Sequence, residues 1–107
     1  MENNMIITGL EVPNSALPFS PGIRSGDFIF ISGQASTDLN GNILPGQFSE
    51  ECGRAFQNLG AILRAAGLDF SDVVQVRNYV SSQEDLALFN EIYREYFSPP
   101  YPSRTTL

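Results

Sequence analysis

The chain has 107 residues, of which 42% are hydrophobic and 17% charged, the composition of one globular domain and not of a disordered segment. Its net charge is −6 and its six cationic side chains are all scattered arginines, so nucleic acid is a disfavoured partner. With no histidine, no lysine and a single cysteine, Cys52, the chain lacks the groups for imidazole catalysis, a Schiff base, an internal disulfide or a His or paired-Cys metal site.

Strand and turn signals dominate the N-terminal part of the chain. Residues 5–8 are a short β-branched run that predicts a first strand, and the prolines within 13–21 bar regular structure there. Residues 23–32 predict a hairpin around Ser25-Gly26-Asp27. Its second arm is apolar on both faces, as in a strand covered on both sides. The strand end at Ser32-Gly33 allows close approach of a ligand, although a plain turn is as common.

The next stretch predicts a turn and then a long helix. Asn40-Gly41 is a turn signal, and the helix begins near Ser49 and ends at Gly67, which is placed to be a left-handed cap. Apolar residues recur at spacings of three and four, which indicates one buried stripe. The stripe comprises Cys52, Ala55, Phe56, Leu59, Ile62, Leu63 and Ala66. For Cys52 this position favours a buried apolar role over a reactive thiol.

A second strand and helix follow. Residues 73–80 predict a strand with Val74, Val76 and Val80 on one face. Ser82 is a natural N-cap with Asp85 as the partner of a capping box. The apolar stripe of this helix comprises Leu86, Phe89, Tyr93, Tyr96 and Phe97. Asn90 lies beside the stripe, where a backbone partner for its amide is slightly favoured over a contact with a ligand.

The last segment carries the candidate binding group. Pro99 and Pro100 end the helix, and Pro102 favours extended geometry, so Arg104 is presented from a short β-type run. A guanidinium held in this way can bind a carboxylate at two points. The alternative is that an arginine near the chain end is solvated and idle, which is the common state of this residue.

The predicted order is β, β-hairpin, α, β, α, β. It indicates an α+β fold with two helices packed on one face of a single-layer sheet. One helix layer leaves the other face of the sheet open, and apolar side chains there would need to meet another chain. We therefore expect a homo-oligomer.

Ordered segments along the whole chain resemble the RidA/YjgF family of reactive-intermediate deaminases, which carries the older label endoribonuclease L-PSP. The most specific segment is Pro100-Tyr101-Pro102-Ser103-Arg104-Thr105-Thr106, followed by the strand end Ser32-Gly33-Gln34. The other matching segments are Pro18-Phe19-Ser20, Gly26 to Ile31, Phe56-Gln57-Asn58-Leu59, Ala65-Ala66-Gly67-Leu68, Asp72-Val73-Val74, Phe89-Asn90-Glu91-Ile92-Tyr93 and Tyr96-Phe97.

The resemblance implies a chorismate-mutase-like fold and a homotrimer with clefts between neighbouring subunits. It also implies hydrolysis of reactive imino or enamine acids, such as 2-iminopropanoate and 2-iminobutanoate, to 2-keto acids and ammonia without a cofactor or metal. The family usually continues through one more strand, which carries a glutamate thought to orient the water. Because the sequence stops at Leu107, either the sequence is cut short or the protein lacks that strand, and we expect residues 1–107 to form a single RidA-like domain without it.

The family's site residues transfer position by position. Arg104 matches the arginine that clamps the substrate carboxylate, and Thr106 stands where many members have a cysteine whose backbone helps to hold the attacking water. These two are the expected catalytic positions. Ser32 and Gly33 match strand-end positions that line the cleft, and Asn90 matches a helix position near it. Phe19, also expected to bind substrate, stands where many members have a tyrosine and lacks its hydroxyl.

Three functions compete on this evidence. A 2-iminobutanoate/2-iminopropanoate deaminase comes first. A non-catalytic module that binds small carboxylates or a partner comes second, and both Phe19 and the missing strand favour it. An endoribonuclease or translation inhibitor comes third because of the acidic charge. No apolar run could span a membrane and no signal pattern opens the chain, so we expect a cytoplasmic protein with no membrane partner.

Overall fold

Two groups of strands and two helices make up the chain in the computed structural model, which describes residues 4–107. Strands β1 (Met5–Ile6), β2 (Gly22–Ser25) and β3 (Phe28–Ile31) form an antiparallel ladder in that order. The predicted hairpin is confirmed, since Ser25 pairs with Phe28 across a turn in which Gly26 has a φ of 61°. This positive φ is readily adopted by glycine, which favours it at such two-residue turns.

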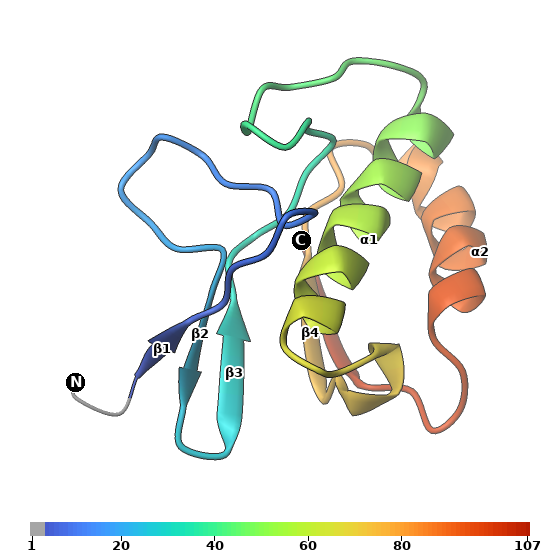
Figure 1. The fold of residues 1–107 in the computed structure, drawn as a ribbon. Helices are drawn as coiled ribbons and strands as arrows, with labels where there is room; N and C mark the ends of the chain where they lie inside the picture. The colour runs from blue at the N-terminus through green and yellow to red at the C-terminus, as the bar shows by residue number, and fades with distance from the viewer. Residues whose placement is uncertain (1–3) are drawn as a thin grey trace.

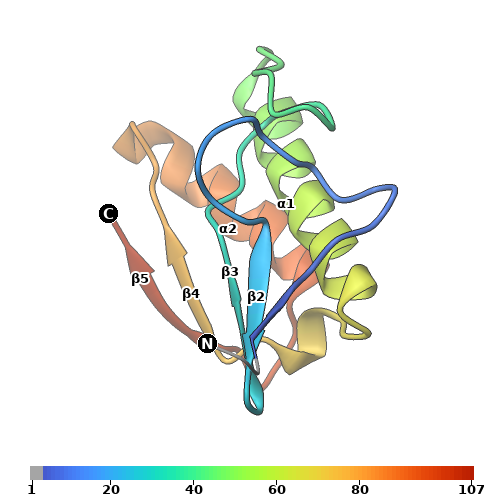
Figure 2. The same cartoon turned by 60° about the vertical axis from the view of Figure 1, so that its left-hand side comes forward.

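A parallel pair of strands completes the β-structure. In it β4 (Gln75–Asn78) pairs with β5 (Ser103–Thr106), so that Val76 lies opposite Arg104 and Asn78 opposite Thr106. Figure 2 shows the two strand groups side by side, with both helices behind them. Within residues 4–107 no hydrogen-bonded ladder joins the groups, so the single sheet expected from the sequence is divided in two. The predicted α+β class is confirmed.

The helices cover one side of the strands (Figure 1). Helix α1 runs over Phe48–Ala65, and the Gln47 N–H donates to Glu50 Oε1 at 3.1 Å before its first turn. Gly67, two residues after the helix, has a φ of 78° and is the left-handed cap that the sequence predicts. A 3₁₀ turn, η1 (Phe70–Asp72), follows α1 and leads into β4.

The start of the second helix differs from the prediction. Ser82 caps a 3₁₀ turn, η2 (Gln83–Asp85), by accepting the Glu84 N–H at 3.2 Å, and α2 occupies Leu86–Tyr96. The predicted capping box with Asp85 was therefore wrong, because the cap serves this tighter turn. Val74 was also placed wrongly: it precedes β4 and is 73% exposed, whereas Val73, Val76 and Val80 pack on the core.

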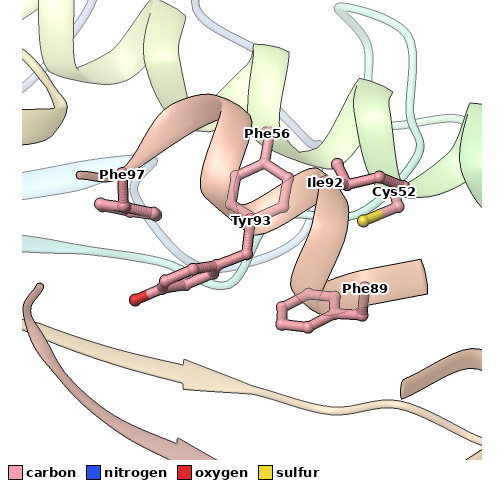
Figure 3. Packing of buried hydrophobic residues seen from close by; sticks show 6 residues of the cluster. All are labelled: Cys52, Phe56, Phe89, Ile92, Tyr93 and Phe97. Atoms are coloured by element: carbon pink, nitrogen blue, oxygen red, sulfur yellow. The ribbon is translucent and has the colours of Figure 1, made fainter. Parts of the chain in front are cut away.

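An aromatic cluster between the helices and the β4–β5 pair forms the larger core (Figure 3). It comprises Cys52, Phe56, Phe89, Ile92, Tyr93 and Phe97. Cys52 is buried, as predicted, and burial raises the pKa of its thiol to about 11. A second cluster, made of Ile7, Val12 and Ile62, joins α1 to the hairpin, and Ile62 is fully enclosed.

The outer side of the hairpin is apolar. Ile29 and Ile31 pack on the second cluster, whereas Phe28 and Phe30 are 64% and 66% exposed. This alternation follows from the two-residue period of a strand. The prediction of an arm that is apolar on both faces is confirmed. Among the described residues, no helix is both long and apolar enough to cross a lipid bilayer.

Candidate functional site

Arg104 lies on β5 and reaches over the aromatic cluster. Its guanidinium carbon is 4.9 Å from the centre of the Tyr93 ring and 5.4 Å from that of Phe89. Cation–π attraction at these distances restrains the side chain, although the residue is exposed in the single chain. The predicted presentation of Arg104 from a strand is thus confirmed, and the guanidinium is oriented by its neighbours and not free in solvent.

A pocket of about 320 Å³ opens beside this guanidinium. It is lined by Asn90, Tyr93, Arg94, Tyr101, Pro102 and Arg104. The lining carries two guanidinium groups and no carboxylate. Within residues 4–107, Arg104 forms no ion pair, so its donors remain available. A pocket with this charge suits a small anion, above all a carboxylate, which matches the planar fork of an arginine.

Asn90 reaches the same pocket from α2. The sequence slightly favoured a backbone partner for its side-chain amide. That preference was wrong, because this amide has no hydrogen-bond partner in the described part of the chain. An amide placed in this way can donate to a ligand and accept from it. The structure therefore brings two of the six predicted site residues, Arg104 and Asn90, into one cavity.

Thr106 follows Arg104 by two residues on β5 and therefore shares its face of the strand. The Thr106 hydroxyl donates to Asn78 Oδ1 across the strand pair at 3.3 Å. The other end of that amide, Asn78 Nδ2, is buried without a partner among residues 4–107. Thr106 does not line the pocket, but it lies on the same strand as Arg104, which does.

The remaining predicted residues form a second group at the end of the hairpin. The Ser32 hydroxyl donates to the Ser20 carbonyl at 2.6 Å, which ties the loop that carries Phe19 to the end of β3. Phe19 is 49% exposed, and a Cβ added at Gly33 would meet no atom within 4 Å. None of these residues lines the pocket of Arg104 within one chain.

The sequence did not single out Tyr93 as a functional residue. It is only 5% exposed, yet its hydroxyl has no hydrogen-bond partner within residues 4–107. Burial raises the pKa of this phenol while the nearby Arg104 charge opposes the rise. The available signal was the phenol itself on the buried stripe of the helix, since a buried phenol normally finds a partner.

A second hollow of about 330 Å³ lies at the C-terminal end of α2, where Phe70, Tyr96, Phe97 and three prolines form much of its wall. It contains none of the predicted site residues. In the described part of the chain, no three His, Cys, Asp or Glu side chains gather where they could hold a metal ion.

Known proteins resemble this chain over most of its length. The family model described as Endoribonuclease L-PSP matches residues 10–107. A 2-iminobutanoate/2-iminopropanoate deaminase of Mus musculus is 37% identical over 100 residues, which cover 92% of this chain and 74% of that protein. A RutC family protein of Pyrococcus horikoshii is 36% identical over 96 residues, which cover 89% and 76%.

Solved structures give the same result. RidA from the Antarctic bacterium Psychrobacter is 29% identical and superposes with a TM-score of 0.89, covering 96% of this chain and 84% of that one. TdcF of E. coli, solved with bound serine, is 28% identical with a TM-score of 0.85, again over 96% and 84%. These likenesses extend across the fold and include both segments that hold the predicted site residues.

Proposed function

Because the chain belongs to the RidA/YjgF family, also described as endoribonuclease L-PSP, we propose that it hydrolyses small 2-imino acids, such as 2-iminopropanoate and 2-iminobutanoate, to 2-keto acids and ammonia. Relatives that are 35–37% identical carry the name of this deaminase. The observation that carries the proposal is the guanidinium of Arg104, which forms no ion pair within residues 4–107 and faces a pocket that no described carboxylate lines.

Arg104 binds the substrate carboxylate through two parallel N–H donors. Its position over the rings of Tyr93 and Phe89 restrains the guanidinium and so limits the directions in which C2 of the substrate can point. A fixed orientation turns the attack of water into an almost unimolecular step. The Asn90 amide, on the same wall, hydrogen-bonds the substrate and limits its rotation.

The chemistry requires water and proton transfers only. The water oxygen adds to C2 while the C=N π electrons move to nitrogen, which takes up a proton. In the resulting carbinolamine the hydroxyl proton passes to the amino nitrogen, the C–N bond breaks, ammonia leaves and a C=O bond forms. The backbone around Thr106, two residues from the clamp, is the place where this chain would hold the attacking water.

Assembly into a homotrimer would complete the site. The exposed rings of Phe28 and Phe30, with Val74 and Tyr79 at 73% exposure each, leave apolar surface that a second copy can cover. The group formed by Phe19, Ser32 and Gly33 lies outside the pocket of a single chain. Contacts across a subunit interface supply the missing wall in this proposal.

A binding module without turnover is the second candidate. Phe19 favours it, because its ring cannot supply a hydroxyl to substrate or water. The related TdcF, solved with bound serine, is a solved example of a small amino acid held by this fold. Such a module would bind 2-ketobutanoate by the same Arg104 contact but leave the imine lifetime unchanged.

One assay separates these outcomes. A 2-imino acid is generated in situ, and keto-acid release is followed with wild type, Arg104→Ala or buffer. We expect acceleration by wild type and its loss in Arg104→Ala, since removing one partner of a desolvated charge pair costs about 2–5 kcal/mol. Arg64→Ala, at the end of α1, is the matched control and should behave as wild type. Equal rates for wild type and buffer, with binding of 2-ketobutanoate retained, would select the binding module.

A further inference from the structure

The hydroxyl of Tyr93 is a buried donor for which the described part of the chain offers no acceptor. The residue is 5% exposed, and no acceptor among residues 4–107 reaches its oxygen. Leaving a buried hydroxyl without a hydrogen bond destabilises the folded state. Buried polar groups are seldom left unpaired, so each exception calls for an explanation.

The position of this hydroxyl supplies one. Tyr93 lines the same pocket as Asn90 and Arg104, and the guanidinium of Arg104 lies 4.9 Å from the centre of its ring. In Figure 3 the hydroxyl points out of the aromatic cluster, away from Phe89 and Ile92. An anion held by Arg104 would therefore occupy a cavity that Tyr93 also lines.

We propose that the Tyr93 hydroxyl is a further ligand-binding group and donates a hydrogen bond to the carboxylate that Arg104 holds. This inference rests on the proposed function and deepens it, because it assigns a second contact to the same end of the substrate. A carboxylate has about four acceptor sites, of which a bidentate arginine occupies two. The phenol would fill a third and select ligands whose carboxylate lies in one plane relative to the ring.

The phenol must be protonated to play this role. Desolvation raises its pKa above the ordinary value and the Arg104 charge only partly opposes this, so the neutral O–H form persists near pH 7. The ring itself belongs to the core: its centre lies 4.5 Å from that of Phe97 and 5.9 Å from that of Phe89. Packing thus holds the donor in place before a ligand arrives, which lowers the entropy lost on binding.

Tyr93→Phe tests this assignment because it keeps the ring, the packing and the cation–π contact while removing only the hydroxyl. Titration calorimetry with 2-ketobutanoate should show affinity weakened by about 10-fold or more, the typical loss for a hydrogen bond to a charged group. Thermal unfolding should show an unchanged or higher Tm, because the hydroxyl has no partner to lose. Tyr96→Phe is the matched control, since Tyr96 lies on the same helix and lines the other hollow.

Further measurements separate a ligand contact from a structural role. In the Arg104→Ala background, Tyr93→Phe should have little additional effect, since the carboxylate is no longer held beside the phenol. In wild type labelled with ¹³C at tyrosine Cζ, the Tyr93 signal should shift when 2-ketobutanoate is added while the Tyr96 signal stays in place. This labelling experiment needs no Tyr93 variant and therefore does not depend on its folding.

Binding of Tyr93→Phe at wild-type strength, or a Tm several degrees below wild type, would overturn the assignment. If Arg104→Ala loses the ligand while Tyr93→Phe keeps it, the inference falls and the proposed function stands. If wild type binds no 2-ketobutanoate, both fall together.

Discussion

Replacement of Arg104 by lysine separates charge from geometry in the proposed clamp. Lysine keeps the positive charge but presents a compact ammonium, which cannot bind a carboxylate with two parallel donors or stack as a plane on Tyr93 and Phe89. Loss of one charge-assisted hydrogen bond costs about 1.5–3 kcal/mol. Each exposed cation–π contact adds about 0.5–1 kcal/mol, part of which an ammonium can retain.

The expected result is affinity for 2-ketobutanoate roughly 10- to 150-fold below wild type, and a further loss in Arg104→Ala. Calorimetric titration measures the affinity, and release of keto acid from a 2-imino acid made in situ measures the rate. Arg64→Lys controls for the general effect of the exchange. Because Arg104 is exposed in the chain, the Tm of the Arg104 variants should differ little from that of wild type. Wild-type affinity and rate in Arg104→Lys would refute the planar clamp and leave only a general attraction between charges.

Three other expectations concern the core, the thiol and the assembly. Ile62→Ala should lower the free energy of unfolding in urea by about 2–5 kcal/mol because the side chain is fully enclosed, and a loss below 1 kcal/mol would contradict that packing. Cys52 should resist a thiol reagent at pH 8 until the protein unfolds, because burial raises its pKa to about 11, and rapid labelling of the native protein would count against this protection. Since the folded pKa lies above the ordinary value of 9.0, the contribution of the thiol to stability is present below pH 9 and is lost as the pH rises through 11. Phe30→Glu should convert a trimer to monomers in light scattering, and an unchanged mass would exclude this face from the interface.

Local patterns predicted the elements well where burial and backbone geometry agree. The α1 stripe is an example: Cys52, Phe56, Ile62 and Leu63 recur at helical spacing and are all buried. Gly26 and Gly67 were placed correctly because both adopt positive φ values that other residues rarely tolerate. The strand that carries Arg104 was also predicted, since the prolines before it leave few alternatives to extended backbone.

The errors arise where long-range contacts decide. Val74 has the β-propensity of its neighbours, but β4 begins one residue later, after the η1 turn, and Val73 takes the place in the core. Ser82 has the right chemistry for a cap, but sequence alone does not distinguish a 3₁₀ turn from the first turn of a helix. Likewise, residue patterns do not encode whether β3 pairs with β4, and in the described part of the chain these two strands form no ladder.

The candidate site was predictable only in part for a related reason. The flanking sequence and the resemblance pointed to Arg104 and Asn90, and both line the pocket. Arg94 and Tyr101 escaped notice because they become part of a cavity only when α2 and the segment before β5 lie side by side. Tyr93 was assigned to the core, which is correct for its ring and incomplete for its hydroxyl.

The most direct test is a crystal structure of the assembled protein with 2-ketobutanoate bound. We expect both carboxylate oxygens to lie at about 2.7–2.9 Å from the Arg104 nitrogens, in the cavity shared with Asn90 and Tyr93. A ligand seated elsewhere, with the Arg104 side chain turned into bulk solvent, would contradict the account.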